Sequence, residues 1–573
     1  MKKKPNVMVI LTDDQGYGDL SRTGNTNLAT PHIDALAEEG AVLNNFFVQP
    51  LCAPTRSEFL TGRYYSRTGV RGVTRRAERI NLDEKTIGDL FLENGYKTGC
   101  FGKWHSGLQY PYHPNGRGFE EFIGYCCGHW SHYFDSTIEH NGKEYQSEGY
   151  LTDALTDGAI DFIKQNKDHP FFCYIPLNTP HSPFQVPDKY FNRFTNENVK
   201  LRADEPERED LLRTRSVLAM CENIDWNVGR LLQTLDDLKL MEDTIIVYFS
   251  DNGPNTVRWN GGMQGIKGDV EEGGVKSPCS ITWKNHIPKG LSIDEIAGAI
   301  DLLPTLTSLT ATPLTTHKPL DGFDITPLLF GKKELYPNRL IFAKKVTSTH
   351  EQSIISVRSN TFRAGGRLKG LYDMTKDIGQ HQDISQEHPD TFATLTRAIN
   401  DFDNSLPKEV SDPSIPVGYE AFPYTDLPAQ DADLKGKLTW SSIHPNASYI
   451  VHWRDIKDTL SWAIDVQQAG HYLVELKYTC EKSSIGTALQ LTFGDHTLQG
   501  RLLESYESEI KDQEDRVMRE ESYDKAFYTM VLGSIYLPHV KGLLTLQATS
   551  MTGNHVCDLR GIRLVLQSNN AIL

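Results

Sequence analysis

Short apolar runs recur through the first three hundred residues, and each run gives way to polar residues. Val7–Thr12, Lys97–Phe101, Phe171–Leu177 and Ile245–Phe249 are rich in β-branched and aromatic side chains. Continuous apolar runs of this length are typical of strands that are buried on both faces, as in parallel sheets. The pattern therefore predicts an α/β fold in this part of the chain.

Between these runs the apolar residues recur at helical spacing. Helices are predicted over Pro31–Leu43, over Asp83–Asn94, which Gly95 closes, and over roughly Arg208–Leu238. In the first helix the apolar positions are Ile33, Leu36, Ala37 and Val42. In the longest the predicted apolar stripe comprises Leu211, Leu212, Leu218, Ile224, Val228, Leu231 and Leu235.

Polar side chains suited to ligand binding follow each of the four predicted strands. In open α/β sheets, ligands bind beyond the carboxyl ends of the strands. The pattern therefore predicts one site assembled from several strand ends. In chain order the residues at these ends are Asp13, Asp14, Lys103, His105, His181, Asp251 and Asn252.

The second half of the chain has a different pattern. Pro319–Leu406 is predicted to be a smaller α+β unit ending in a helix over Asp390–Asn404, and the Pro- and Asp-rich stretch Ser411–Leu434 a linker. The remainder alternates as a β-sandwich does, interrupted by a charged segment, about Glu504–Lys525, for which we expect an inserted helix or a mobile loop. The predicted sandwich strands are Tyr449–Trp453, Leu460–Val466, Tyr472–Tyr478, Ala488–Phe493, Leu543–Ala548 and Ile562–Leu566.

Length and charge narrow the possible functions. At 573 residues the chain exceeds one ordinary core, and its formal charge of −16 disfavours nucleic acid as a partner. No apolar stretch is long enough to span a bilayer. We see no signal peptide, so the protein is expected to be cytoplasmic, or periplasmic or secreted if a leader was removed. The nine cysteines lack a regular spacing, and we expect most to be reduced and buried.

Six ordered sequence blocks resemble the type I sulfatases of the alkaline phosphatase superfamily. The central block, Cys52-Ala53-Pro54-Thr55-Arg56, matches the C-x-P-x-R signature, in which that family oxidises the cysteine to formylglycine. A single C-x-P-x-R is a weak pattern, but six blocks in the family's order are a strong one. The other blocks are Asp13-Asp14-Gln15-Gly16, Gly102-Lys103-Trp104-His105, Thr179-Pro180-His181, Ser250-Asp251-Asn252-Gly253 and Gly265-Ile266-Lys267-Gly268.

The resemblance covers roughly residues 5–405 and implies a domain plan. We expect an alkaline phosphatase-like mixed sheet flanked by helices over residues 1–318 and a C-terminal α+β subdomain over 319–410. Leu371-Tyr372-Asp373-Met374 resembles a segment that recurs in that subdomain. A linker over 411–434 and a β-sandwich over 435–573 complete the plan. The sandwich lies outside the resemblance and is similar in outline to carbohydrate-binding modules.

The resemblance also implies a metal site and a nucleophile. Asp13, Asp14, Asp251 and Asn252, with an oxygen of modified Cys52, are expected to hold a hard divalent cation. Oxygen ligands in a flexible cage favour Ca²⁺, with Mg²⁺ as the alternative. The hydrate of the aldehyde formed from Cys52 is expected to attack sulfur, and Arg56 to hold it. A formylglycine-generating or maturase enzyme is therefore an implied partner.

Further roles follow from the same resemblance. Lys103 and Lys267 are expected to clamp the sulfate group. His181 is expected to protonate the leaving alcohol and His105 to accept a proton from the hydrate, although the two roles can be exchanged. Asp251 is expected to help deprotonate the attacking hydroxyl. Aromatic and polar residues nearby are candidates for saccharide binding: His129, Trp130, His132, Arg258 and Trp259.

The expected activity is hydrolysis of sulfate esters on a carbohydrate, because the blocks around Lys103 and His129 look most like bacterial carbohydrate sulfatases. Two departures, Glu271 where an aromatic is common and Thr55 where serine is frequent, leave the essential positions intact. Two alternatives stay open: a phosphate mono- or diesterase of the same superfamily, and an inactive protein that binds sulfated glycans. Phosphate release without formylglycine would identify the first, and binding without sulfate release the second.

Overall fold

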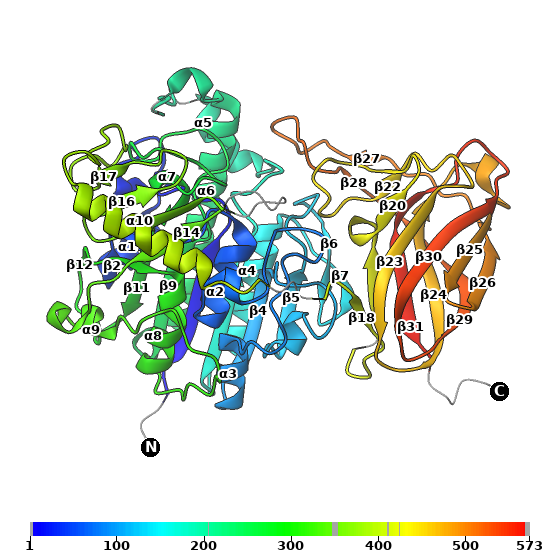
Figure 1. The fold of residues 1–573 in the computed structure, drawn as a ribbon, viewed down its shortest axis with the longest axis horizontal. Coiled ribbons are helices and arrows are strands. Elements are labelled where there is room, and N and C mark those ends of the chain that lie inside the picture. Colours follow the sequence, from blue (N-terminus) through cyan, green and yellow to red (C-terminus); the bar gives the residue numbers. More distant parts are fainter. Residues whose placement is uncertain are drawn as a thin grey trace.

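A mixed sheet forms the centre of the N-terminal half (Figure 1). The computed structural model describes residues 4–196, 198–203, 205–345, 353–408, 412–422 and 424–567. Within these ranges the sheet has ten strands. In spatial order they are β12 (Leu291–Ile293), β2 (Ala41–Leu43), β11 (Cys279–Trp283), β9 (Thr244–Ser250), β1 (Asn6–Thr12), β8 (Phe171–Pro176), β4 (Lys97–Lys103), β5 (Glu121–Tyr125), β6 (Thr137–His140) and β7 (Lys143–Gln146).

The middle of this sheet is parallel. Strand β1 pairs in parallel with β8 and β9, and β4 with β8 and β5. All residues of β1, β8 and β9 are buried, as their continuous apolar runs predict. The expected α/β fold is therefore confirmed.

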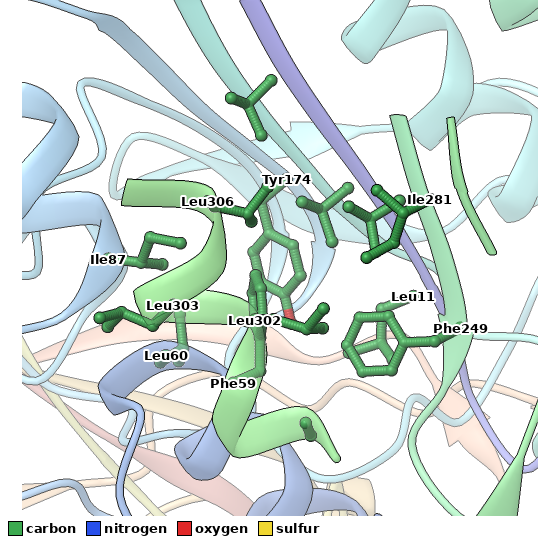
Figure 2. Packing of buried hydrophobic residues seen from close by; sticks show 14 of the residues in the cluster. Leu11, Phe59, Leu60, Ile87, Tyr174, Phe249, Ile281, Leu302, Leu303 and Leu306 are labelled. Carbon is green, nitrogen blue, oxygen red and sulfur yellow. The ribbon is translucent and has the colours of Figure 1, made fainter. Parts of the chain in front are cut away.

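Helices cover both faces of the sheet. Met8 and Ile10 of β1 share a core with α1 (Pro31–Glu38), α4 (Leu151–Gln165) and α6 (Leu211–Asp237). Val7, Val9 and Leu11 pack on the other face with α2 (Cys52–Thr61), α3 (Ile87–Glu93) and α8 (Leu302–Leu309). Figure 2 shows Leu11 and Phe249 of the sheet beside Phe59 of α2 and Leu302 of α8. This two-sided cover fixes the position of the strand ends.

Three predicted helices are shorter in the structure. The helix expected over Pro31–Leu43 ends at Glu38, and Val42 belongs to β2 instead. Helix α3 begins only at Ile87, because the Thr86 side chain caps it by accepting a hydrogen bond from the Asp89 N–H. Helix α6 begins at Leu211, but Leu211 and Leu212 are 36% and 42% exposed and do not join its buried stripe.

A smaller α+β unit follows the central sheet. Its antiparallel strands are β14 (Ile341–Lys344), β15 (Ile355–Arg358), β16 (Phe362–Gly365) and β17 (Leu371–Asp373), and α10 (Pro389–Asn404) packs on them. The small sheet β10 (Lys276–Ser277), β3 (Phe46–Phe47) and β13 (Ala297–Gly298) shares a core with β14. The short helices are α5 (Asp188–Asn196), α7 (Glu272–Val275) and α9 (Thr326–Leu329).

The C-terminal part is a sandwich of two sheets around one core that includes Trp453 and Trp462. One sheet contains β18 (Ile415–Val417), β20 (Asp433–Lys435), β23 (Thr459–Val466), β30 (Lys541–Ser550), β25 (Ala488–Phe493) and β26 (His496–Arg501). The other contains β19 (Thr425–Pro428), β21 (Thr439–Trp440), β22 (Ile450–Val451), β31 (Asp558–Leu566), β24 (Gly470–Thr479) and β29 (Tyr528–Leu537).

The stretch 411–434 differs from the expected linker. Strand β18 pairs with β23, and β19 pairs with β31, so these residues form edges of the sandwich. The buried side chains of Ile415, Val417 and Leu427 explain this placement, since they complete its core. Residues 409–411, where the predicted unit boundary falls, lie outside the described residues. The division at 318 stays a prediction.

Of the two alternatives expected for the charged segment 504–525, the helix is wrong, since the segment forms none and is mostly loop. It contains a two-stranded ribbon, β27 (Ile510–Lys511) with β28 (Asp524–Lys525). Figure 1 shows this ribbon reaching from the sandwich towards the N-terminal half.

All nine cysteines are free and buried, in agreement with the expectation of mostly reduced thiols. Among the described residues, none of the helices combines the length and hydrophobicity needed to cross a membrane.

Candidate active site

Four parallel strands end at one edge of the central sheet, and the polar residues after them meet there. Strand β1 leads into Asp13 and Asp14, β9 into Asp251, β4 ends at Lys103, and the turn after β8 carries His181. Backbone hydrogen bonds hold the ends together: the Asp13 N–H donates to the Thr179 carbonyl at 3.0 Å, and the Asp251 N–H to the Thr12 carbonyl at 3.1 Å. The convergence expected from the pattern is present.

Cys52 faces this acidic cluster from the first position of α2. Its Sγ lies 3.4 Å from Asp13 Oδ1 and 4.0 Å from Asp14 Oδ1. No side chain caps the helix, so its first N–H groups favour negative charge there. Burial, and then the Asp251 carboxylate, raises the pKa of the Cys52 thiol far above its usual range. As a thiol, this side chain is a poor nucleophile.

The oxygens around Cys52 fit a cation. Ligand atoms of Asp13, Asp14, Cys52 and His181 all lie within 4.8 Å of one another. The Asn252 amide donates to Asp14 Oδ1 at 2.8 Å, while its own Oδ1 is buried without a hydrogen-bond partner among the described residues. An unpartnered buried acceptor beside carboxylates matches the oxygen donor set of a hard divalent ion.

Two buried cations, Arg56 and Lys103, and the partly exposed Lys267 surround the carboxylates. Arg56 donates from Nε and Nη2 to Asp251 Oδ2, at 3.1 and 2.8 Å. Lys103 Nζ lies 2.7 Å from Asp13 Oδ2, and Lys267 Nζ 2.7 Å from Asp14 Oδ1. Despite partial burial, Asp14 holds the pKa of Lys267 well above its usual range, so this lysine is charged at neutral pH. Burial, and then Asp13, raises the pKa of Asp251 to about 6.

The two candidate histidines are held in opposite ways. His181 Nδ1 lies 2.6 Å from the Ser182 carbonyl, which can only accept, so Nδ1 carries a proton and Nε2 faces Asp14 Oδ2 at 3.6 Å. His105 Nε2 donates to the Val73 carbonyl at 2.8 Å, and its buried Nδ1 has no partner among the described residues. Burial, and then Lys103, lowers the pKa of His105 well below its usual range, so it is neutral with a free lone pair at Nδ1.

The candidate saccharide-binding residues His129, Trp130 and His132 have different surroundings in the structure. The His129 ring stacks on His181, with centroids 5.9 Å apart, and its buried Nε2 has no partner among the described residues. Trp130 stacks on Tyr125 and lines a pocket of about 430 Å³ between the sandwich and the N-terminal half. His132 instead contacts Gln185 and lies 3.8 Å from Glu514, away from the metal cluster.

Arg258 contacts the backbone of Asp14, and Trp259 follows it in the chain. All donors of Arg258 are engaged within the protein, by Asp19, Asn255, Thr256 and the Asp14 carbonyl. Arg258 therefore braces the Asp14 loop rather than presenting free donors to a ligand. Trp259 lies under the guanidinium of Arg202, whose Cζ is 4.4 Å from the ring centroid.

Two residues near His181, Ser182 and Glu521, were not predicted as site residues from the sequence. The Ser182 hydroxyl donates to the Glu521 carboxylate, and these two residues are 339 positions apart. Ser182 was visible only as a neighbour of the His181 block. Glu521 lies in the charged segment that interrupts the sandwich pattern, and that interruption was its only signal.

An alkaline phosphatase-like α/β fold with acidic and amide oxygens, buried cations and a helix-terminal cysteine at one sheet edge defines a hydrolase of anionic esters. Comparison with known proteins is more specific. The family model named Sulfatase matches residues 5–312, and the chain belongs to that family, whose members are sulfuric ester hydrolases. Formylglycine and a bound metal ion are typical of the family.

Similarity to individual proteins agrees with this family membership. Arylsulfatase A of Homo sapiens is 29% identical over 450 residues, which cover 67% of this chain and 83% of that protein. N-acetylgalactosamine-6-sulfatase of Canis lupus familiaris is 30% identical over 365 residues, covering 57% of this chain and 66% of that protein. Among solved structures, Ps i-CgsB in complex with k-i-k-neocarrahexaose is similar with a TM-score of 0.64 and 29% identity, over 72% of this chain and 95% of that one.

Proposed function

We propose that this enzyme hydrolyses a sulfate ester on a carbohydrate, giving an alcohol, inorganic sulfate and a proton from the ester and water. The observation that carries the proposal is the gathering of Lys103, Lys267 and His181 around Asp13, Asp14 and Cys52. Two cations and an acid beside one nucleophile position match the charges of sulfate ester hydrolysis. Charge accumulates on the sulfate oxygens and on the leaving oxygen in its transition state.

Position 52 supplies the nucleophile. The modifying enzyme, with its oxidant, converts Cys52 to formylglycine, an aldehyde. Addition of water gives the hydrate, and one of its hydroxyl groups is the proposed nucleophile at sulfur. Cys52 is only 3% exposed in the folded chain. A formylglycine-generating or maturase enzyme therefore acts on this residue before the chain has folded around it.

The oxygens of Asp13, Asp14, Asp251 and Asn252 are the proposed ligands of a Ca²⁺ ion, which polarises the sulfate group when bound. Calcium suits the cage better than Mg²⁺, because carboxylates and an amide from two separate loops make a flexible site of oxygen ligands. The Asn252 Oδ1 has no hydrogen-bond partner in the part of the chain that the structure describes, which supports this assignment. Arg56 is the proposed support of this site, since it holds Asp251 in place and adds positive charge beside position 52.

Lys103 and Lys267 are the proposed sulfate clamp. Each lysine is paired with one of the two adjacent aspartates, so both ammonium groups point to the same place. A sulfate group bound beside position 52 takes up hydrogen bonds from both ammonium groups. Each such contact contributes to rate when it strengthens as negative charge develops.

His181 and His105 are each assigned one of the two proton transfers of the reaction. The Nε2 edge of His181 faces the site, so His181 is the proposed acid for the leaving alcohol. Burial, and then Lys267, lowers its pKa to about 4, and the negative charge of a bound sulfate ester acts in the opposite direction. His105, neutral with a free Nδ1, is the proposed base that accepts a proton from the side chain at position 52.

The carbohydrate is expected to lie between His129 and the cavity beside Lys267. That cavity has a volume of about 700 Å³, enough for saccharide units. His129 offers a ring nitrogen that has no partner among the described residues, and Trp130 an aromatic surface in the lining of the 430 Å³ pocket. The similarity to Ps i-CgsB, solved with k-i-k-neocarrahexaose, supports a glycan substrate.

The test is sulfate release, measured by ion chromatography, from a panel of sulfated mono- and oligosaccharides with phosphate monoesters as controls. Wild type is expected to release sulfate and no phosphate. Lys267→Met is expected to lose most of this activity. Lys289→Met, which removes an exposed lysine paired with Glu39, is the matched control and should retain it. Equal rates for the two variants, or release of phosphate instead of sulfate, would contradict the proposal.

A further inference from the structure

The charged segment of the sandwich lies against the N-terminal half next to the active site. The Arg516 N–H donates to the Phe184 carbonyl at 3.1 Å, and Gln185 Nε2 donates to Asp515 Oδ1 at 2.7 Å. Arg519 donates to the Ser131 carbonyl. Val517 packs against the hydrophobic core that contains Phe184. The segment is therefore anchored directly after the turn that carries His181 and to the neighbouring loop at Ser131.

One side chain of this segment reaches the turn itself. The carboxylate of Glu521 accepts a hydrogen bond from the Ser182 hydroxyl, and Glu521 is partly buried. Although burial raises it, the hydrogen bond from the Ser182 hydroxyl holds the pKa of Glu521 below its usual value, so the carboxylate is charged. A hydrogen bond to a charged acceptor is about twice as strong as a neutral one.

The backbone around Glu521 is held by a second loop of the sandwich. Ser441 Oγ lies 2.6 Å from Ser522 Oγ, and the Ser442 hydroxyl donates to the Glu520 carbonyl at 2.7 Å. These bonds flank Glu521 on both sides. The loop that carries Glu521 is therefore held in place on both sides, and with it the position of the Glu521 carboxylate beside Ser182.

Ser182 in turn holds the ring of His181. The Ser182 carbonyl accepts a hydrogen bond from His181 Nδ1 at 2.6 Å and another from the Tyr133 hydroxyl at 3.0 Å. Ser182 Oγ lies 3.5 Å from the same Nδ1. With Nδ1 held, Nε2 is directed towards Asp14 and position 52. A chain of contacts therefore leads from Glu521 to Ser182, from Ser182 to His181, and from His181 to the metal cluster.

We propose that Glu521, supplied by the C-terminal sandwich, is a positioning residue that orients His181 through Ser182. The inference rests on the proposed role of His181 as the acid for the leaving alcohol. It assigns the sandwich a part in the reaction, because a residue of this domain completes the support of a catalytic side chain. A small rotation of an acid–base group away from the reacting oxygen lowers rate without loss of binding.

The substrate's leaving group gives a readout that a general structural defect does not. A sugar alcohol leaves poorly unless protonated, whereas the phenolate of 4-nitrocatechol sulfate leaves without a proton. Misplacement of His181 therefore slows the sugar sulfate selectively. The two probes are 4-nitrocatechol sulfate and the fastest substrate from a panel of glucose, galactose and N-acetylhexosamine sulfates.

Glu521→Ala is expected to lower kcat on the sugar sulfate about 10- to 100-fold, as loss of a supporting hydrogen bond does at other sites, with KM little changed. The kcat on 4-nitrocatechol sulfate should stay within about threefold. Glu521→Gln, which keeps an acceptor for Ser182, should lose less. Ser182→Ala, which leaves the sandwich contact surface intact, should show the same selective loss as Glu521→Ala.

Glu520→Gln is the matched control. Glu520 is the neighbour of Glu521 in the chain, but its own carboxylate is exposed and lies 3.5 Å from His444 Nε2. This variant should behave as wild type. Equal losses on both probes, or no loss in Glu521→Ala and Ser182→Ala, would overturn the inference. His181→Gln separates the two proposals. If it fails to discriminate between the probes, the assigned role of His181 is wrong; if it discriminates and Glu521→Ala does not, only the positioning role is wrong.

Discussion

Replacement of Arg56 by methionine tests how the buried charges of the site are balanced. The Arg56 side chain is fully buried, and it donates twice to Asp251 and once, at 2.7 Å, to the Lys103 carbonyl. Methionine fills similar volume but carries no charge and no donor. Arg56→Met therefore leaves Asp251 buried without the cation that binds it directly.

The structure sets the size of the effect. Removing one partner of a fully buried ion pair costs about 3–5 kcal/mol of stability, because the remaining charge is neither solvated nor paired. The pKa of Asp251 is already raised to about 6 with Arg56 in place. Loss of the arginine raises it further, so the carboxyl becomes protonated near neutral pH, which places the cost towards the lower end of that range.

Arg367 provides a matched comparison. It also pairs with an aspartate, Asp269, at 2.7 Å, but its side chain is 51% exposed. An exposed pair contributes about 0–1 kcal/mol. Arg367→Met removes the same kind of side chain and is expected to leave stability almost unchanged.

Differential scanning calorimetry at pH 7.5, after removal of divalent ions with EDTA, measures both variants. Arg56→Met should lower the melting temperature of the N-terminal half by at least about 5 °C, and Arg367→Met by less than about 2 °C. A similar, small shift in both variants would refute the reasoning, because it would mean that Asp251 does not depend on Arg56 for its charge compensation.

Three further changes have defined outcomes. Lys103→Met, which removes one of the two proposed sulfate contacts, should lower kcat/KM for sulfate release about 100- to 1,000-fold, and a loss below tenfold would argue against a clamp. Chelation of divalent ions should abolish sulfate release and lower the melting temperature, with recovery on addition of Ca²⁺; full activity after exhaustive chelation would contradict the metal site. Burial, and then Asp431, raises the pKa of Glu78 from 4.5 to about 7, so the folded chain binds this proton more tightly than the unfolded chain. The contribution of protonated Glu78 to the free energy of unfolding is fully present below about pH 4.5 and is lost as pH rises towards 7. Glu78→Gln should therefore raise the melting temperature at pH 8 and flatten the pH dependence of the melting temperature between these values. An unchanged pH profile of the melting temperature would show that Glu78 is ionised in the folded chain.

The strand ends could be predicted from the sequence because the relevant signals are local. Buried parallel strands are continuous apolar runs. Asp13 and Asp251 follow such runs directly, and His181 lies in the turn after another. Parallel pairing then brings their ends to one edge without further information.

The contacts of the sandwich could not be predicted in this way. Glu521 and Ser182 are 339 residues apart, and no local pattern in either segment specifies the other. The stretch around Ile415 and Leu427 was interpreted as a linker because Pro and Asp dominate it, whereas a few buried side chains place it at the sandwich edges. Arg258 was a candidate ligand contact by proximity in sequence, and only the structure shows Asp19 bound to its guanidinium.

The central claim is that position 52 supplies the nucleophile for sulfate ester hydrolysis. The most direct measurement is sulfate release from the saccharide panel by wild type and by Cys52→Ala, with phosphate esters alongside and mass spectrometry of the peptide that contains residue 52. We predict sulfate release by wild type only, in proportion to the fraction of chains converted to formylglycine. Sulfate release that persists in Cys52→Ala would contradict the account.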